Sequence, residues 1–413
     1  MKSEEFAAAV NSGGLSMLEN IFHTVKEASR ALALVEDARR NLLLEHLADA
    51  ISANQQLLLE ANRKDLEQMD AKDPLYDRLL LTSERLQGIA SDMRHVASLP
   101  SPLGIITKER TLENGLYLRR VSVPFGVIGV IYEARPNVSF DVFSLCFKSG
   151  NACILKGSRN AQYSNEAIVS LIHQTLQADG LPVDVVALMP STHEATGQLL
   201  DAVGYVDLCI PRGGKKLIEF VRDNARVPVI ETGAGVVHAY FDKDGDLEKG
   251  RAIINNAKTR RGSVCNALDC LLVHKDRVGD LPALLAPMKD KVCMHQPKEG
   301  EPFDWDREWM SYDLSVRIVS SIDEALQHIQ AHGSGHSECI ITENDEAAMR
   351  FQREVDAACI YVNAPTSFTD GAQFGLGAEI GISTQKLGPR GPMALEEMTT
   401  YKWLINGNGQ VRK

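Results

Sequence analysis

The sequence lacks several features that mark particular classes of protein. None of its eight cysteines forms a CxxC pair with zinc-ligand spacing, and they are too scattered along 413 residues to form the disulfide framework of a small secreted protein. The longest apolar stretch, residues 121–132, is interrupted by one proline and two glycines and is not a membrane span. No charged-then-apolar signal segment opens the chain. We therefore expect a cytoplasmic protein with reduced thiols.

Positive charge is also scarce. Lys and Arg number 44 against 55 Asp and Glu, which gives a net charge of −11. This balance argues against binding to nucleic acid or to a membrane surface, although it allows a local basic pocket for an anionic small molecule. The chain has no internal repeat and no low-complexity segment. Its 44% hydrophobic and 24% charged residues are typical of a globular enzyme with two or three domains.

The hydrophobic pattern predicts helices first, followed by alternating strands and helices. Apolar positions at helical spacing occupy residues 1–100. Near-continuous apolar runs, typical of buried parallel strands, then alternate with helical segments in two series that meet near residues 229–235. This order predicts an α/β fold with two doubly wound domains. The first series is expected to close with a strand at VPVIE.

Two features near the C-terminal end complete the expected fold. The glycine-rich stretch FGLGAEIGIST is predicted to be loop or turn. TTYKWLI alternates as a strand does, but it stands alone, and a lone strand needs a partner. That partner is either LYLRRVSV within the chain or a strand of another subunit.

The stretch NNAKTRRGSVCNALDCLLVH contains the candidate nucleophile. Cys265 lies there after two arginines and several small residues, just before an apolar strand pattern. An exposed thiol near positive charge has a lowered pKa and a larger thiolate fraction. Local context leaves a second interpretation equally open, that of a buried core cysteine. Cys270, on the apolar strand itself, is better explained as core filler.

Polar or small residues follow three predicted strands of the first series. Asn137 follows IYEARP, Lys156 ends ACILK, and Gly213 and Gly214 follow VDLCIPR. Ligands of open α/β sheets bind at these carboxyl ends, where an Asn amide suits an oxyanion and a cation or glycine turn suits a dinucleotide. Taken singly, each is better explained as a turn or surface residue. The GxGxxG fingerprint is absent.

Taken together, the segments resemble the aldehyde dehydrogenase superfamily in order and spacing from about residue 20 to about residue 410. The resemblance is greatest to the branch that reduces L-glutamyl 5-phosphate to L-glutamate 5-semialdehyde in the second step of proline biosynthesis. It implies an aldehyde dehydrogenase-like fold of two doubly wound α/β domains plus a small β oligomerisation flap. The segments that carry it include VPFGVIGVIYEARPNV, CILKGSRNA, IPRGGKKLI, ETGAG, NAKTRRGSVCN, HGSGHSECIIT and RGPMALEEMTTYKW.

The resemblance also implies a division of the chain. A cofactor-binding domain is expected over residues 1–110 and 125–230, and a catalytic domain with the nucleophile over residues 231–365. A glycine-rich return segment then covers residues 366–396. The β-hairpin-like oligomerisation element is expected from residues 111–124 and 397–413.

Roles of single residues follow from the same resemblance. Cys265 is expected to be the nucleophile and Asn137 the oxyanion donor. Arg135 and Arg261 are candidates for binding the substrate, which carries an anion at each end, and Arg390 is a further one. Glu231 matches a position of the family, and for this chain a capping or orienting role is preferred over base catalysis. The expected cofactor-binding residues are Lys156, Ser158, Arg159, Gly213, Gly214 and Glu308.

The preferred cofactor is NADPH. Arg159 lies three residues after Lys156, where NAD-preferring relatives often carry Glu. A carboxylate there accepts the ribose 2′-hydroxyl, whereas an arginine suits a 2′-phosphate. The resemblance further predicts a small-molecule substrate, no metal, a homo-oligomer and functional coupling to glutamate 5-kinase.

Two alternatives stay open at this point. A hydrolytic semialdehyde dehydrogenase would use the same thiol but release its thioester with water. A non-catalytic structural relative would need none of this chemistry, and the presence of Cys265, Asn137 and Lys156 argues against it.

Overall fold

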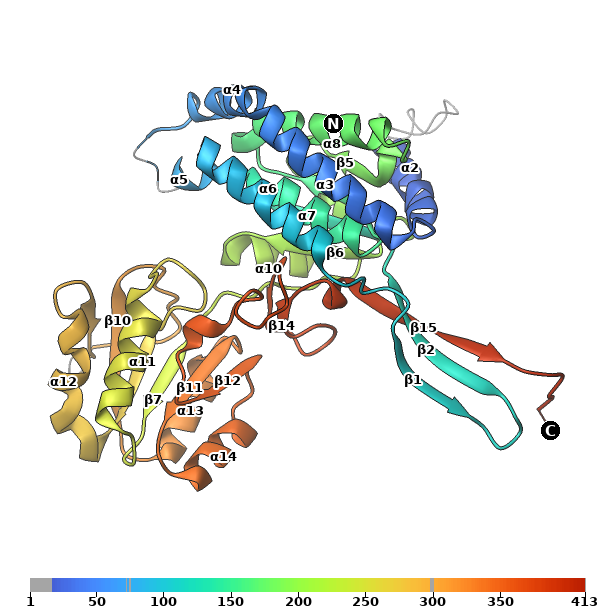
Figure 1. Ribbon diagram of the computed structural model, residues 1–413. Coiled ribbons are helices and arrows are strands. Elements are labelled where there is room, and N and C mark those ends of the chain that lie inside the picture. The colour runs from blue at the N-terminus through green and yellow to red at the C-terminus, as the bar shows by residue number, and fades with distance from the viewer. Residues whose placement is uncertain (1–16, 72, 74–75, 298–300, 413) are drawn as a thin grey trace, which may run out of the picture. The chain divides into compact units, whose positions relative to one another are not determined.

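The computed structural model describes residues 17–71, 73, 76–297 and 301–412. The chain divides into two compact units, each with its own sheet and helices (Figure 1). The first unit comprises Met1–Ile230 and Ala394–Lys413, and the second comprises Glu231–Met393. The second unit is therefore inserted into the sequence of the first.

Helices open the first unit, as the sequence predicts. On α3 (Asp37–Ala53), Leu43, Leu47 and Ile51 recur every four residues and are fully buried, while α3 packs against α6 (Ser83–Ser98) and α8 (Gln162–Ala178). The fully buried Lys148 ammonium binds the Asp37 carboxylate at 3.0 Å and so ties α7 (Asn137–Lys148) to the start of α3. The helices of this region are α2 (Met17–Leu32), α3 (Asp37–Ala53), α4 (Gln55–Leu66), α5 (Tyr76–Leu79) and α6 (Ser83–Ser98).

A four-stranded parallel sheet forms the core of the first unit, in the order β5-β4-β3-β6. Every residue of β3 and β4 is buried, which explains their continuous apolar sequence. The strands are β3 (Val127–Tyr132), β4 (Ala152–Lys156), β5 (Val186–Leu188) and β6 (Leu208–Arg212). The accompanying helices are α7 (Asn137–Lys148), η1 (Arg159–Ala161), α8 (Gln162–Ala178), η2 (Val183–Val185), α9 (His193–Leu200) and α10 (Lys215–Asn224).

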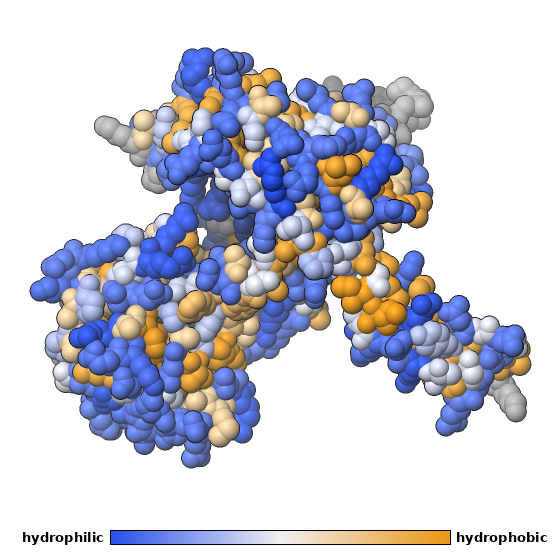
Figure 2. All heavy atoms as spheres, in the orientation of Figure 1, coloured by the Kyte–Doolittle hydropathy of each residue, from blue (hydrophilic) through white to orange (hydrophobic). Residues whose placement is uncertain are grey.

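A separate three-stranded antiparallel sheet also belongs to the first unit, and its two faces are largely exposed. β2 (Tyr117–Pro124) lies between β1 (Ile106–Thr111) and β15 (Thr399–Asn406), so the terminal strand pairs with LYLRRVSV within the chain. Apolar side chains are visible on this sheet among hydrophilic neighbours (Figure 2). Ile106 and Ile405 are 46% and 59% exposed.

The second unit is built on a six-stranded parallel sheet in the order β12-β11-β7-β8-β10-β9. Neighbouring strand residues alternate between two apolar layers: Phe241 and Leu271 face one layer, Tyr240 and Leu272 the other. Its strands are β7 (His238–Phe241), β8 (Cys270–His274), β9 (Cys293–His295), β10 (Asp313–Val319), β11 (Ser337–Ile341) and β12 (Cys359–Val362).

Helices lie between the strands of the second unit in sequence, and with the parallel sheets of both units they confirm the predicted fold class. None of the described helices is long and apolar enough to cross a membrane. The helices are α11 (Leu247–Thr259), η3 (Lys275–Asp280), α12 (Leu281–Leu285), η4 (Ala286–Met288), α13 (Ile322–His332), α14 (Asp345–Glu354) and η5 (Thr366–Phe368). η6 (Glu396–Met398) precedes β15 in the first unit.

Two predictions of local structure are wrong. The expected strand at VPVIE is only a single bridge between Val229 and Cys209, because the chain leaves the first unit at Ile230 and its next bridge, from Thr232, goes to Ser383. The glycine-rich stretch is not all loop. Its segment β13 (Gly381–Ser383) pairs with β14 (Gly391–Met393) in a buried two-stranded sheet.

Candidate active site

In the first unit, the predicted residues gather at one edge of the four-stranded sheet. Arg135 and Asn137 follow β3, and Lys156 and Ser158 lie at the end of β4. Gly213 begins the turn after β6. Because β4, β3 and β6 are parallel neighbours, their carboxyl ends lie together and form the edge where α/β proteins bind ligands.

Asn137 is the first residue of α7, and its amide is held in one orientation. Asn137 Nδ2 donates a hydrogen bond to Asp141 Oδ2, one helical turn later, at 2.9 Å. Burial raises the pKa of Asp141 to about 6, while the Asn137 hydrogen bond opposes that rise. An amide nitrogen carries two hydrogens, so this bond leaves the second one available for another acceptor. Asp141 is a positioning residue that the sequence did not suggest.

Two polar side chains at the end of β4 have no hydrogen-bond partner among the described residues. The Lys156 side chain is largely buried, burial lowers its pKa, and its ammonium has no hydrogen-bond partner among the described residues. Ser158 Oγ is buried and also unpaired within the part of the chain described. Arg159 lies next to them and is exposed. Buried polar groups are normally hydrogen-bonded, so this group of residues fits a polar ligand such as the ribose and phosphate of a dinucleotide.

A backbone N–H group in the turn after β6 is already hydrogen-bonded within the protein. Gly214 N–H, at the start of α10, donates to Glu133 Oε2 at 3.1 Å. A Cβ at Gly213 would lie 2.7 Å from the Glu133 carboxyl carbon, so the Glu133 side chain occupies the space beside this glycine. A pyrophosphate placed at this helix N-terminus would have to displace Glu133. The predicted contact of Gly213 and Gly214 with the cofactor therefore stays a prediction.

In the second unit, Cys265 lies in the loop between α11 and β8, and it is partly exposed. The loop is closed by the hydrogen bond from Leu268 N–H to the Ala257 carbonyl at 3.1 Å, and a tight turn joins Ala267 N–H to the Val264 carbonyl. Of the other cysteines, six are buried and Cys293 is exposed. The thiol of Cys265 is thus on a fixed turn at the surface of this unit.

Gly235 joins Cys265 to Glu308. A Cβ at Gly235 would lie 1.8 Å from the Cys265 carbonyl oxygen, so the two backbones are in direct contact. Gly235 N–H donates to Glu308 Oε1 at 3.0 Å. The structure therefore brings together two predicted site residues that are 43 positions apart, 308 − 265, through a glycine for which no role was predicted.

Asp269 ties together the same three segments, and the sequence did not suggest it. One of its oxygens accepts from Trp309 N–H at 3.1 Å and the other from Val237 N–H at 3.4 Å. The fully buried Lys258 ammonium lies 3.9 Å from it and has no hydrogen bond among the described groups. Burial raises the pKa of Asp269 to about 7, against the opposing effects of Lys258 and the backbone donors. Lys258 and Asp269 therefore lie on either side of the Cys265 loop in the sequence.

The residue after the nucleophile is anchored separately. Asn266 Nδ2 donates to the Thr369 carbonyl at 2.9 Å, and Thr366 Oγ1 donates back to the Asn266 carbonyl at 3.0 Å. These bonds fix the loop to the segment that follows β12. The signal in the sequence is weak, because Asn266 differs from an ordinary turn residue only by its position beside Cys265.

The remaining predicted residues make few contacts that indicate a role. Arg261 is exposed beside the Cys265 loop. Glu231 is partly buried, and its backbone N–H donates to Gln385 Oε1 at 3.0 Å. Arg390, a further candidate for anion recognition, is bound to Asp356 at 2.7 Å and is therefore less available to a substrate.

Comparison with known proteins gives concordant matches. A family model described as the aldehyde dehydrogenase family matches residues 2–309. Gamma-glutamyl phosphate reductase of Bacteroides fragilis is 57% identical to this chain, and the alignment covers 96% of this chain and 100% of the relative. Its counterpart from Pelodictyon phaeoclathratiforme is 56% identical, covering 94% and 97%. The crystal structure of gamma-glutamyl phosphate reductase from Thermotoga maritima is 39% identical with a TM-score of 0.93, covering 96% and 100%.

Proposed function

The chain belongs to the aldehyde dehydrogenase family, with gamma-glutamyl phosphate reductases among its relatives, and from this premise we propose that it reduces L-glutamyl 5-phosphate to L-glutamate 5-semialdehyde and phosphate with NADPH. This would be the second step of proline biosynthesis from glutamate. The observation that carries the proposal is the partly exposed Cys265, fixed on a turn whose backbone contacts Gly235, the partner of Glu308.

In the first step, the Cys265 thiolate attacks the acyl carbon of the substrate. The S–C bond forms and the C–O bond to phosphate breaks, so phosphate leaves with the electron pair and a thioester remains on Cys265. The oxyanion that develops is held by the second Nδ2 hydrogen of Asn137 and by the Cys265 backbone N–H. Arg135 and Arg261 bind the two anionic ends of the substrate.

Lys156, Ser158 and Arg159 at the end of β4 would hold the cofactor, and Glu308 would bind the nicotinamide ribose. When bound, NADPH supplies the hydride that reduces the thioester. The chain then releases the aldehyde as the Cys265 sulfur takes back the electron pair of its bond to carbon, which regenerates the thiolate. Lys156 and Ser158 support this assignment because their polar groups lack partners within the described protein.

Glu231 has no base role in this scheme. Phosphate, not water, is the partner of the thioester, so a carboxylate that activated water nearby would divert the intermediate to glutamate. The partial burial of Glu231 and the bond from its backbone to Gln385 suit an orienting role. Glu231→Gln should keep turnover within about tenfold of the parent. Loss of all turnover with substrate binding intact would contradict this assignment.

The reverse reaction tests the reaction type. L-Glutamate 5-semialdehyde and NADP are incubated with increasing phosphate, and NADPH formation is followed by absorbance, with Cys265→Ala as control. We expect the rate to rise with phosphate and to vanish in Cys265→Ala. NADPH formation that is independent of phosphate and accompanied by glutamate would instead assign the hydrolytic alternative. An active Cys265→Ala variant would exclude the thioester.

The cofactor preference is tested at Arg159. We expect kcat/KM to be higher with NADPH than with NADH, and Arg159→Glu to lower it with NADPH by roughly 10- to 100-fold, because a favourable charge pair with the 2′-phosphate becomes a repulsive one. Arg159→Ala is the matched control, with a smaller loss. Equal efficiency of the parent with both cofactors would refute the role of Arg159.

We also infer a homo-oligomer assembled through the three-stranded sheet. A sheet of this size is stable only when one face is covered, yet nearly all of β1 and β15 is exposed. A second copy of the chain would provide that cover. Functional coupling to glutamate 5-kinase remains a prediction, motivated by the lability of an acyl phosphate in water.

A further inference from the structure

Two groups of histidine, cysteine and aspartate within the described residues have donor atoms close enough to share a metal ion. One comprises His238, Cys270 and His328 and is fully buried. The other comprises Cys293, His295 and Asp313 at the β9 edge of the six-stranded sheet. Their burial distinguishes them, because a ligand nitrogen must carry a lone pair and a ligand sulfur must lose its proton, and both changes are easier at a solvent-exposed site.

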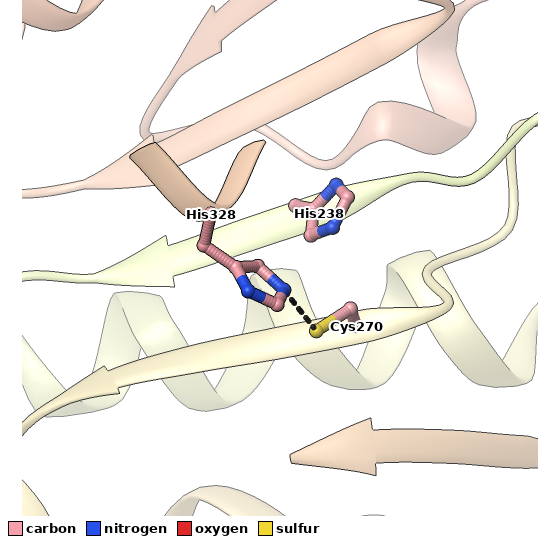
Figure 3. A group of neighbouring side chains, drawn as sticks. All are labelled: His238, Cys270 and His328. Carbon is pink, nitrogen blue, oxygen red and sulfur yellow. Dashed lines mark hydrogen bonds between the residues drawn. The ribbon is translucent and has the colours of Figure 1, made fainter. Parts of the chain in front are cut away.

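The buried group is arranged for hydrogen bonding and is a poor metal site. His328 and Cys270 face each other at 3.7 Å beside His238 (Figure 3). Arg317, which can only donate, lies 2.7 Å from His328 Nδ1, so the proton of this imidazole is on Nε2, the nitrogen that faces Cys270. Burial also raises the pKa of the Cys270 thiol well above its ordinary value. Metal binding would have to reverse both of these states.

We propose that Cys293, His295 and Asp313 form a binding site for a divalent transition-metal ion of the zinc class. β9 and β10 are parallel neighbours, and Asp313 pairs directly with Cys293. Cys293 and His295 are two residues apart and therefore point to the same face of the sheet as Asp313. Three different donors thus meet on one face, with ligand atoms within 4.8 Å of one another.

The distances require only small movements. His295 Nε2 and Asp313 Oδ1 are 2.7 Å apart in a hydrogen bond. Tetrahedral zinc bonds of about 2.0–2.3 Å place ligand atoms roughly 3.5 Å apart, so the pair must open. Cys293 Sγ lies within 4.8 Å of both other ligand atoms, so it must approach by at most about 1.3 Å, 4.8 − 3.5. Side-chain rotation on a sheet edge allows both shifts. Three protein ligands leave a fourth position for water.

The surroundings favour a bound cation in three ways. Cys293 is exposed, so an ion reaches its sulfur directly from solvent. Asp313 accepts a hydrogen bond from Ser311 at 2.5 Å on its Oδ2 atom, which orients the carboxylate. The His295 ring stacks on Trp309 at 4.4 Å, which fixes its orientation. Supporting contacts of this kind orient metal ligands. Cysteine and imidazole donors together favour zinc over magnesium or calcium.

Cobalt is the probe for this site, because thiolate ligation to Co²⁺ gives an intense near-ultraviolet absorption. Chelator-treated full-length protein is titrated with Co²⁺ while absorbance and tryptophan fluorescence are recorded. We expect the band to appear with quenching of Trp309, which stacks on a ligand, and Zn²⁺ to abolish the band by competition. Cys293→Ser should remove the band. His295→Gln should weaken binding by at least the roughly 10- to 100-fold that changes in supporting residues produce.

Two matched variants separate this site from other thiols. Cys265→Ser removes the partly exposed thiol of the candidate active site, and it should retain the band. Cys270→Ala tests the buried group and should also retain it. Loss of the band in either variant, its persistence in Cys293→Ser, or its absence from the parent protein would overturn the proposal. The readout is independent of enzymatic activity, so the proposed function stands or falls separately.

Discussion

Close packing around single atoms determines where the nucleophile lies. Gly235 has no side chain because the Cys265 carbonyl occupies the space that a Cβ would need. The φ angle of Gly235 is not positive, so glycine is required there for space and not for backbone conformation. The same glycine donates to Glu308, so any displacement there also reaches a residue proposed to hold the cofactor.

Gly235→Ala should therefore lower kcat/KM by roughly 100-fold, the effect of moving a reacting group by about 1 Å. Gly279→Ala is the matched control, because it lies in the same unit with no atom within 4 Å of the added Cβ. Circular dichroism should show that both variants fold. Wild-type activity in Gly235→Ala would mean that the loop around Cys265 yields easily.

Titration of Asp141 should make activity and the free energy of unfolding change in opposite directions with pH. Above its pKa of about 6 the carboxylate accepts from Asn137 Nδ2, whereas the protonated acid no longer requires that orientation. Activity should therefore rise through about pH 6. The native pKa lies above the unfolded value, so the native state binds more protons between about pH 4 and pH 6, and the free energy of unfolding decreases over that window as the pH rises.

Asp141→Asn should remove both responses. We expect kcat to fall by about tenfold, since the amide of Asn137 loses its charged acceptor, and the rise near pH 6 to disappear from the pH–rate profile. Melting temperatures of the parent and the variant between pH 4 and pH 7 provide the second measurement. An unchanged pH–rate profile in Asp141→Asn would show that Asp141 does not position Asn137.

At the scale of elements, the Cys265 loop depends on a buried ion pair between its flanks. Lys258 lies on α11 before the loop, and Asp269 directly precedes β8 after it. Asp269→Asn should lower the stability of the second unit by about 3 kcal/mol, because it removes the nearest counter-charge of the buried Lys258 ammonium. Chemical denaturation followed by intrinsic fluorescence measures the change.

The double variant Lys258→Met/Asp269→Asn is the matched control. Removing both charges eliminates the unpaired ion, so the double variant should be more stable than Asp269→Asn alone. Strictly additive losses in this double-mutant cycle would mean that the two residues do not interact.

Much of the element order could be predicted from hydrophobic pattern, and the exceptions have physical causes. β1 was not predicted because all six of its residues are exposed and three of them, Lys108, Glu109 and Arg110, are charged. β9 has only three residues, too few for a pattern. The sheet edge that carries the candidate ligand-binding residues could be predicted, because the carboxyl ends of neighbouring parallel strands lie together. Contacts such as Gly235 with Cys265 or Asp269 with Trp309 depend on backbone packing between distant segments, which no local pattern encodes.

At the scale of the whole molecule, the exposed three-stranded sheet predicts assembly. Ile405→Glu places a charge on apolar surface of β15 and should reduce the oligomer to smaller species, as measured by sedimentation velocity. Val411→Glu is the matched control, since Val411 is 83% exposed and lies after the last strand. An unchanged mass in Ile405→Glu would exclude this part of the sheet from the interface.

The pairing of β2 with β15 also determines when the three-stranded sheet can be completed during translation. β2 ends at Pro124 and β15 begins at Thr399, so the ribosome adds 399 − 124 = 275 residues before the second edge of β2 can be covered. At about 5–20 residues per second, that interval lasts roughly 14–55 s. The whole inserted unit emerges within it. During translation the nascent chain therefore carries an open strand edge that neighbouring chains on the same messenger can capture.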